Sequence, residues 1–210
     1  MNTIKKYKNT PIELFEDWAK KDKDKGMEKG HNDSVSFMIK KIKKEKEKGN
    51  RGVDIGCGNG WAVRKMKKEL EYKKIIGIDG SKTMIKKAKI TDPKGQYKCE
   101  NIEQHNTKQK YDFVHSMEVL YYLKKPQEFI KNVYDNWLTK KGLFILGIDH
   151  YKENKPSINW PKECGVYMNT KTKEEWIKIL KSAGFANIKN WQVCKKDKWE
   201  GTLVIMGNKV

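Results

Sequence analysis

The chain has 210 residues and a formal net charge of +19, with 46 basic against 27 acidic residues. A chain of this length fits one domain that buries about two-thirds of its unfolded surface, and no apolar run approaches the ~20 residues of a membrane span. The four cysteines form no Cys-x-x-Cys pair and residues 1–6 lack the apolar core of a secretory signal. Zinc sites and disulfides are therefore not expected, and the sequence favours a cytoplasmic protein with reduced thiols.

The basic surplus allows two interpretations. Only Arg51 and Arg64 are arginines, so lysine supplies nearly all of the positive charge. Arginine recognises phosphates and bases through a rigid bidentate fork, and a polyanion-binding surface made of lysine alone would be unusual. Lysine, asparagine and isoleucine have AT-rich codons, so genome composition is the favoured explanation. A nucleic-acid partner is not favoured but stays open.

The N-terminal part predicts two helices that precede a sheet. Thr10 followed by proline has the pattern of an N-cap, and a helix is expected over 12–20. Residues 20–30 are charged and bounded by glycine, which predicts a loop or a weak helix. Ser34 is expected to cap a second helix over 35–48, whose apolar side chains share one face.

After residue 50, strands and helices alternate, which predicts an α/β fold with a doubly wound parallel sheet. Strands are expected at 51–56, 75–79, 96–99, 111–117 and 142–149, and helices at 60–71, 81–90, 126–138 and 172–183. The last part predicts a hairpin of two extended segments, 188–195 and 202–208. The connection over 149–170 is long, and long loops at the ligand end of a sheet are usually functional.

Residues 51–61 carry the most specific pattern, a strand and a glycine loop that opens a helix. Gly56, Gly58 and Gly60 allow the backbone to approach a ligand and to adopt dihedral angles that a Cβ would block. The dinucleotide fingerprint requires Gly-x-Gly-x-x-Gly, whereas the spacing here is Gly-x-Gly-x-Gly with Asp54 inside the strand. That acid argues against a pyrophosphate and for a ligand with an ammonium group.

This pattern resembles the class I S-adenosylmethionine-dependent methyltransferases. Their first motif is an acid followed by x-Gly-x-Gly-x-Gly, and their second is an acid that ends strand two, which Asp79 matches. Further matches are Glu100-Asn-Ile, Tyr111 to Tyr122 and Lys141 to Gly147, in the expected order over residues 50–210.

The resemblance implies a mostly parallel seven-stranded sheet with a C-terminal antiparallel strand, helices on both faces and an N-terminal helical lid. Residues 1–210 are then one methyltransferase domain, with 1–49 as the lid and 50–210 as a Rossmann-like core.

The resemblance also implies S-adenosylmethionine as cofactor, S-adenosylhomocysteine as product, and no metal. Asp54 is expected to hold the ammonium, Asp79 both ribose hydroxyls, Glu100 the amine of adenine, and Met84 the adenine ring. The other expected cofactor contacts are Gly56, Cys57, Gly58, Asn59, Gly60, Gly80, Ser81, Asn101, Ile102, His115 and Ser116. For Glu100, the role of a solvated surface acid is a nearly equal alternative. For Met84, plain core packing is an equal alternative.

An amine or hydroxyl acceptor must lose a proton, which calls for a base. His150, after strand five, is the best candidate because its ordinary pKa is near neutral, although such a histidine is more often a hydrogen-bonded loop residue. Tyr121 and Tyr122, after strand four, predict either an aromatic wall for a cationic acceptor or core packing. Trp18, His31 and Trp160 are the expected substrate-binding residues, with helix or loop anchoring as the alternative for the two tryptophans.

The sequence therefore predicts an enzyme that methylates a small molecule. An RNA or protein methyltransferase is the alternative, although strand four ends His-Ser-Met-Glu instead of the Asn/Asp-Pro-Pro-Tyr/Phe of many enzymes that methylate base or glutamine nitrogens. A cofactor-binding protein without catalysis and a nicotinamide enzyme are further alternatives. The acceptor and the oligomeric state stay open.

Overall fold

A seven-stranded sheet with the order β3-β2-β1-β4-β5-β7-β6 organises the computed structural model, which describes residues 7–210. The strands are β1 (Lys48–Ile55), β2 (Glu71–Asp79), β3 (Gln96–Cys99), β4 (Tyr111–Met117), β5 (Leu138–Ile148), β6 (Ala186–Val193) and β7 (Thr202–Asn208). Only β7 runs antiparallel to its neighbours, β5 and β6. The predicted sheet is confirmed. Its order reverses between β1 and β4, where doubly wound sheets bind ligands at the carboxyl ends of the strands.

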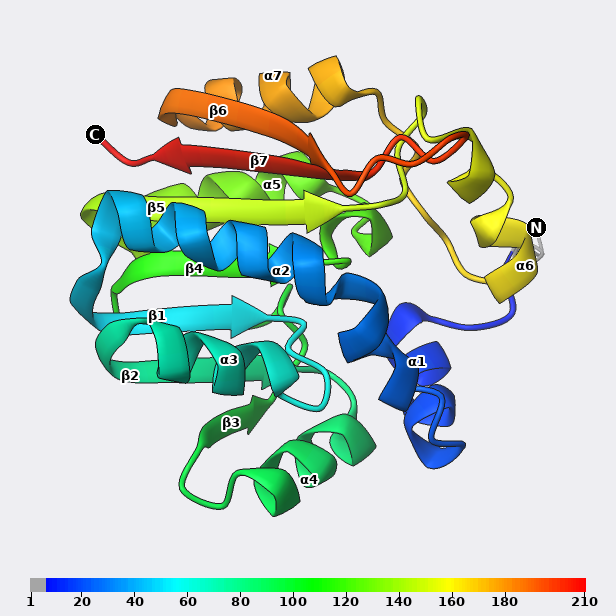
Figure 1. Cartoon of the computed structure of the whole chain (residues 1–210), viewed down its shortest axis with the longest axis horizontal. Coiled ribbons are helices and arrows are strands. Elements are labelled where there is room, and N and C mark those ends of the chain that lie inside the picture. Colours follow the sequence, from blue (N-terminus) through cyan, green and yellow to red (C-terminus); the bar gives the residue numbers. More distant parts are fainter. Residues whose placement is uncertain (1–6) are drawn as a thin grey trace, which may run out of the picture.

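Helices cover both faces of this sheet (Figure 1). They are α1 (Pro11–Lys20), α2 (Lys25–Lys46), α3 (Trp61–Glu69), α4 (Lys82–Thr91), α5 (Pro126–Asn132), α6 (Trp160–Cys164) and α7 (Lys173–Ala183), with short turns η1 (Leu120–Tyr122), η2 (Val133–Trp137) and η3 (Lys155–Ser157). Helices α2 and α3 lie on one face, α5 and α7 on the other, and α1 and α6 lie beyond the strand ends.

The strands next to the centre are buried on both faces, which explains their continuous apolar runs. Successive side chains of a strand point to opposite faces. In β5, Leu143 and Ile145 join the cluster under α2 and α3, whereas Phe144 and Leu146 join the cluster under α5 and α7.

The N-terminal helices agree with the sequence only in part. Thr10 caps α1 as predicted, since its hydroxyl accepts a hydrogen bond from the Glu13 N–H at 3.2 Å and the Glu13 carboxylate bonds back to Thr10. The expected start of the second helix was wrong, because α2 begins at Lys25. Ser34 therefore lies inside the helix, where its hydroxyl hydrogen-bonds with that of Thr202 at 2.7 Å instead of forming a cap.

Another difference lies between α5 and β5. The helix expected over 126–138 ends at Asn132 and continues as a π-helical turn, and β5 then starts at Leu138, before the expected residue 142. Within residues 7–210, no helix combines the length and apolar character that crossing a membrane demands. The predicted lack of a secretory signal in residues 1–6 lies outside the described part.

Candidate functional site

The glycine loop connects β1 to α3 and has the backbone that its sequence requires. Gly56, Gly58 and Gly60 have φ angles of 67°, 52° and 76°, in the left-handed region that favours glycine. A Cβ on Gly56 would lie 2.1 Å from Val119, and one on Gly60 would lie 2.6 Å from a ring atom of Tyr97. Gly56 and Gly60 therefore cannot carry a side chain, because Val119 and Tyr97 pack directly on their backbone.

The middle glycine is packed less tightly than the outer two. A Cβ on Gly58 would find no atom nearer than 3.9 Å, where the side-chain ends of Met27 and Met84 lie. Met27 comes from α2 and Met84 from α4, so two thioethers flank the loop on its ligand side. Gly58 therefore meets only the ends of two flexible side chains, whereas Gly56 and Gly60 meet closely packed ones.

Asp79, at the end of β2, joins this loop to the start of α4. Its Oδ2 accepts a hydrogen bond from the Gly58 N–H at 2.9 Å, and its Oδ1 accepts one from the Ser81 N–H at 2.8 Å. Burial raises the pKa of the Asp79 carboxyl above its ordinary value. Each oxygen keeps a free lone pair, so the two hydroxyls of a ribose would find acceptors here and offset the cost of burial.

Asp54 and His115 lie on the neighbouring strands β1 and β4. The Asp54 Oδ1 and His115 Nδ1 atoms are 2.7 Å apart, and both side chains are buried. The Nε2 of His115 and the Oγ of Ser116 are buried polar atoms without a hydrogen-bond partner. Such atoms cost free energy unless a ligand or water pairs with them. With a proton on Nδ1 facing Asp54, the neutral ring offers Nε2 as an acceptor for an ammonium group.

These observations fit S-adenosylmethionine. The chain offers acceptors for a ribose diol at Asp79, a loosely packed backbone segment at Gly58, and an unpaired polar atom at His115. All of these groups lie at the carboxyl ends of β1, β2 and β4, around the point where the strand order reverses.

Several other predicted cofactor residues support the walls of the site. The Ser81 hydroxyl accepts from the Met84 N–H at 3.1 Å and thereby caps α4, and Gly80 packs against Ile12 of α1. Cys57 is buried, and its sulfur lies toward Gly77 of β2. These residues hold the loops in place.

The residues predicted to contact adenine have partners within the protein. The Glu100 carboxylate pairs with the ring of His105, and the Asn101 Oδ1 accepts from the Glu103 N–H at 3.0 Å. Ile102 belongs to the buried cluster on the α5 and α7 face. An adenine contact by Glu100 stays a prediction, and it would require the carboxylate to leave His105.

Acidic residues of the N-terminal helices bind the edge of the site. The Glu16 carboxylate accepts from the Thr83 hydroxyl at 2.6 Å, the Thr83 N–H at 3.0 Å and the Ser81 hydroxyl at 2.7 Å. Hydrogen bonds from Thr83 and Ser81 hold the pKa of Glu16 at about 2, well below its ordinary value. These bonds tie α1 to the first turn of α4, next to Asp79.

A second contact of the same kind follows at the start of α2. Asp24 accepts from Asn59 of the glycine loop at 2.9 Å and from Lys87 of α4 at 2.6 Å, and Asp22 accepts from Lys87 at 2.7 Å. We call Glu16, Asp22 and Asp24 the acidic latch. The latch anchors the N-terminal helices to the two loops that would hold the cofactor.

Three ionisable side chains converge beyond the glycine loop. Glu118 follows β4, Asp149 follows β5 and His31 comes from α2, and one ligand-type atom of each lies within 4.8 Å of the others. His31 Nε2 lies 3.5 Å from Asp149 Oδ2, and the Tyr121 hydroxyl donates to Glu118 at 2.7 Å. We call His31, Glu118 and Asp149 the Glu118 cluster.

His31 is one of the predicted substrate-binding residues, but the sequence did not single out Glu118. The available signal was its position directly after β4, where side chains reach the ligand end of the sheet. Val119, the next residue, packs on Gly56, so the Glu118 cluster borders the glycine loop.

His150 occupies a different environment from the one expected of a base. Its Nδ1–H donates to the Ser157 carbonyl at 2.9 Å, and its Nε2 is 2.8 Å from the Thr170 hydroxyl. The side chain is fully buried, and burial lowers its pKa. Both ring nitrogens are thus engaged by the long loop after β5. Trp160 of α6 stacks near the same ring, at 6.3 Å between centroids.

Aromatic residues connect α1 with the end of β4. Phe15 contacts both Trp18 and Tyr122 edge to face, at centroid distances of 5.5 and 5.6 Å. Tyr121 and Tyr122 lie 4.4 Å apart, and Tyr121 is almost fully buried. Tyr121 therefore supports Glu118 from inside the core, whereas Tyr122 faces the N-terminal helix.

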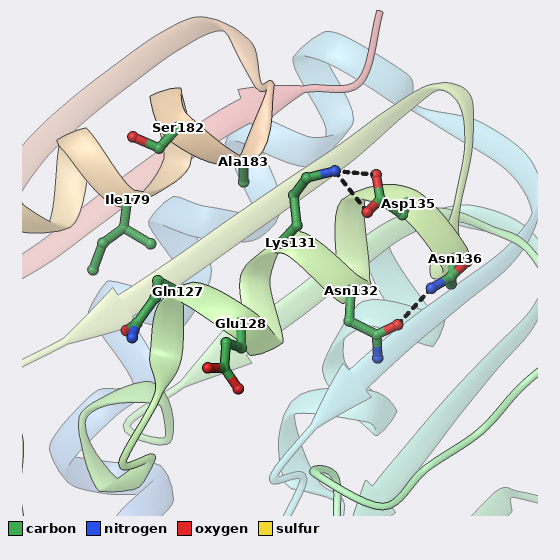
Figure 2. Close-up of a pocket in the computed structure, with 9 residues that line it drawn as sticks. All are labelled: Gln127, Glu128, Lys131, Asn132, Asp135, Asn136, Ile179, Ser182 and Ala183. Atoms are coloured by element: carbon green, nitrogen blue, oxygen red, sulfur yellow. Dashed lines mark hydrogen bonds and ion pairs between the residues drawn. The ribbon is translucent and has the colours of Figure 1, made fainter.

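Two surface hollows lie away from this site. One, of about 560 Å³, lies between α5 and α7 (Figure 2), where its charged side chains already pair along the helix, as Lys131 does with Asp135. The other, of about 640 Å³, is lined by the lysines 152 and 155 and reaches Thr170, the partner of His150. Neither contains a residue of the glycine loop or of the Glu118 cluster.

Comparisons with known proteins identify the family of the chain. The family described as a methyltransferase domain matches residues 27–190. The malonyl-[acyl-carrier protein] O-methyltransferase of Halalkalibacterium halodurans is 26% identical over 162 residues, which are 70% of this chain and 59% of that protein. The chain spans 36% and 59% of the lengths of the first two curated relatives that it matches.

Solved structures show the same fold. A chain of the complex between the Haloferax volcanii Trm112 methyltransferase activator and a protein assigned as a methyltransferase has a TM-score of 0.82 at 23% identity, covering 93% of this chain and 97% of that one. A Thermotoga maritima S-adenosylmethionine-dependent methyltransferase, described as a possible histamine N-methyltransferase, has a TM-score of 0.74 at 22% identity, with 95% and 99% coverage. Together with the match over residues 27–190, these findings show that the chain belongs to the class I S-adenosylmethionine-dependent methyltransferases.

Proposed function

We propose that the protein transfers a methyl group from S-adenosylmethionine to a small-molecule acceptor. The observation that carries the cofactor assignment is the Asp79 carboxylate, which bridges the N–H groups of Gly58 and Ser81. Two acceptor oxygens at the end of β2 match a ribose diol, and the unpaired Nε2 of His115 matches an ammonium group.

The bound cofactor supplies a methyl group on a positively charged sulfur, which makes its carbon electrophilic. The residues of the chain bind, orient and enclose the cofactor and the acceptor. In this proposal Asp79 fixes the nucleoside, and the Asp54 Oδ1, 2.7 Å from His115 Nδ1, favours the tautomer whose Nε2 can accept from the amino group. Fixing both reactants in one geometry accounts for much of the rate enhancement in such a transfer, so positioning is the main task of the protein.

The acidic latch supports a small acceptor over a large one. It ties α1 and the start of α2 to α4 and Asn59, so these helices lie across the ligand end of the sheet (Figure 1). An enclosed site excludes water and admits a small molecule more easily than a folded RNA or protein. We propose that α1 and the first turns of α2 form the lid predicted for residues 1–49, over a core formed by residues 50–210.

Methyl transfer to RNA or protein is the alternative, and the net charge of +19 is the observation that favours it. Binding to RNA at better than ~10⁻⁶ M, with a steep loss of affinity as salt increases, would support this alternative.

Calorimetry with S-adenosylhomocysteine and NAD, followed by a methyl-release screen over small amines, phenols, acids and thiols, tests the proposal. We expect binding of S-adenosylhomocysteine and turnover of a small acceptor. Binding of NAD alone would overturn the cofactor assignment. Turnover of RNA or protein, with every small molecule inert, would overturn the acceptor assignment.

A further inference from the structure

The Glu118 cluster has chemistry that the cofactor does not use. Glu118 and Asp149 place two carboxylates at the ends of the neighbouring strands β4 and β5, and His31 reaches them from α2. We propose that the two carboxylates of this cluster bind the amino group of the methyl acceptor and that Glu118 takes its proton, so that the enzyme is an N-methyltransferase of small amines. This inference rests on the proposed function and adds the acceptor class and the base.

An unpaired acceptor atom points to a ligand that donates hydrogen bonds. Asp149 is 6% exposed, and its Oδ1 is buried without a partner. Within residues 7–210, the contact of its other oxygen, Oδ2, is the long one of 3.5 Å to His31. A buried carboxylate oxygen is costly unless a donor reaches it, and an ammonium or amine group supplies such donors.

Glu118 is held in place by an unusual backbone. Its φ angle is 60°, which is uncommon for a residue with a side chain. The Glu118 N–H donates to the Gly147 carbonyl at 2.9 Å, and its carboxylate accepts from the Asp149 N–H and from the Tyr121 hydroxyl. Strained residues that persist in this way cluster at functional sites. The conformation directs Glu118 to the Asp149 side chain instead of along the strand.

The groups around Glu118 shift the pKa of its carboxyl toward the neutral range, which suits proton transfer. The groups that face it are Asp149 from β5, His31 from α2, and Tyr121 and Tyr122 from η1. Burial and the charge of Asp149 raise the pKa of Glu118 to about 8. Burial alone would lower the pKa of His31. The hydrogen bond and negative charge of Asp149 and the charge of Glu118 outweigh burial and raise the pKa of His31 to about 9. A base whose pKa lies near the working pH is effective in proton transfer.

The aromatic residues next to the cluster match an amine on an apolar skeleton. Tyr121, Tyr122 and Phe15 form a continuous series of rings from the cluster to α1. Ring faces attract cations and apolar groups. A carboxylate or phenolate acceptor would instead meet two acids, and like charges at this distance repel each other.

The proton and electron balance is simple. The ammonium form of the acceptor gives a proton to the Glu118 carboxylate, which becomes the neutral acid. The freed nitrogen lone pair forms the bond to the methyl carbon while the carbon–sulfur bond breaks and leaves its electron pair on sulfur. The product nitrogen carries the new methyl group and the positive charge, and Glu118 returns its proton to solvent.

A matched set of probes separates the acceptor classes. Phenethylamine, 2-phenylethanol and phenylacetate share one skeleton with an ammonium, a hydroxyl or a carboxylate, and each is titrated calorimetrically into the protein saturated with S-adenosylhomocysteine. We expect the amine to bind at least about tenfold more tightly than the other two, as for a charge-assisted hydrogen bond. Titration in phosphate and Tris buffers at pH 7.5 should reveal release of a proton, because an ammonium beside Glu118 favours its ionised form.

Variants assign the effect to named residues. Glu118→Gln and Asp149→Asn should each remove the preference for the amine, and Glu118→Gln should also remove the buffer-dependent heat. His31→Gln deletes a positive charge that competes for Asp149, so it should tighten amine binding several-fold, which a purely structural role would not cause. Glu128→Gln, on exposed Glu128 in α5, is the control and should behave as the wild type. His31→Gln keeps the test decisive if Glu118→Gln fails to fold.

Three results would overturn the inference. One is equal or tighter binding of the alcohol or the carboxylate, and another is no binding of the amine at all. The third is one Zn²⁺ or Mn²⁺ bound per chain in a manner that Glu118→Gln abolishes, which would make the cluster a metal site. Binding of S-adenosylhomocysteine alone tests the proposed function, so its loss is distinguishable from a failure of the amine assignment.

Discussion

The Asp79 Oδ2 accepts a hydrogen bond from the Gly58 N–H at 2.9 Å, although the two residues are 21 positions apart in the sequence. This bond fixes the distance between the glycine loop after β1 and the acid at the end of β2. In the proposed binding mode the nucleoside and methionyl parts of the cofactor lie on opposite sides of this bond, so that binding mode depends on this contact.

Replacing Asp79 with alanine should therefore weaken binding of S-adenosylhomocysteine by about 1–3 kcal/mol, the range of lost charge-assisted hydrogen bonds. Isothermal calorimetry measures the change. Glu69→Gln, at the C-terminal end of α3, removes a surface ion pair with Lys65 and serves as the control. Unchanged affinity in Asp79→Ala would place the ribose elsewhere.

The Glu118 cluster should make folding stability depend on pH. The pKa of Glu118 is raised from 4.5 to about 8, and that of His31 from 6.5 to about 9. For both groups the folded state binds more protons than the unfolded state between the two pKa values, so the free energy of unfolding falls as the pH rises through this window. Urea unfolding at pH 6, 7, 8 and 9 measures the decline.

The decline should be smaller in Glu118→Gln and His31→Gln, and Glu128→Gln should retain it. A wild type whose stability is flat or rising from pH 6 to 9 would show that the cluster does not hold these protons.

Glu16→Gln should loosen the N-terminal helices. The variant removes the negative charge of the side chain that accepts three hydrogen bonds. This should lower the free energy of unfolding by about 1–2 kcal/mol and speed amide hydrogen exchange in α1. Because these bonds lower the pKa of Glu16 from 4.5 to about 2, their contribution is present above pH 4.5 and lost as the pH falls toward 2. Dissociation of S-adenosylhomocysteine, followed by stopped flow, should become several-fold faster.

The matched control is Glu28→Gln on exposed Glu28 of α2. Equal dissociation rates in the Glu16 variant and the wild type would mean that ligand exchange does not require the latch to open.

A variant of His150 distinguishes the two candidates for the general base, His150 and Glu118. Because both ring nitrogens are hydrogen-bonded in a buried loop, His150→Ala should lower stability by about 2–4 kcal/mol, as expected for a cavity and lost hydrogen bonds. The pH–rate profile of the folded variant should keep the ascending limb near pH 8 that Glu118 supplies. A variant with normal thermal stability that lacks this limb would instead identify His150 as the base.

The local sequence was sufficient to predict the sheet and the glycine loop. Gly56, Gly58 and Gly60 follow an apolar strand, and Asp79 ends the next, so both had to reach the same edge of a parallel sheet. The start of α2 could not be predicted in this way. Gly26 and Gly30 disfavour a helix, and the helix begins at Lys25 because Asp24 is fixed by Asn59 and Lys87 from distant parts of the chain.

The acceptor side of the site was less accessible to sequence reasoning. Glu118 reaches Asp149 only because its backbone adopts a left-handed conformation at the end of β4, and nothing in a local pattern indicates that conformation for glutamate. The sequence left His150 as either a base or a hydrogen-bonded loop residue, because its partners, Ser157 and Thr170, lie 7 and 20 residues further along an irregular loop. Contacts of this kind depend on tertiary packing, which a single sequence does not specify.

A crystal structure with bound S-adenosylhomocysteine tests the central claim most directly. We expect both ribose hydroxyls within hydrogen-bonding distance of the Asp79 carboxylate, the amino group at Asp54 and His115, and the sulfur directed toward Glu118. A nucleoside bound in the hollow between α5 and α7, or a ribose without contact to Asp79, would contradict the account.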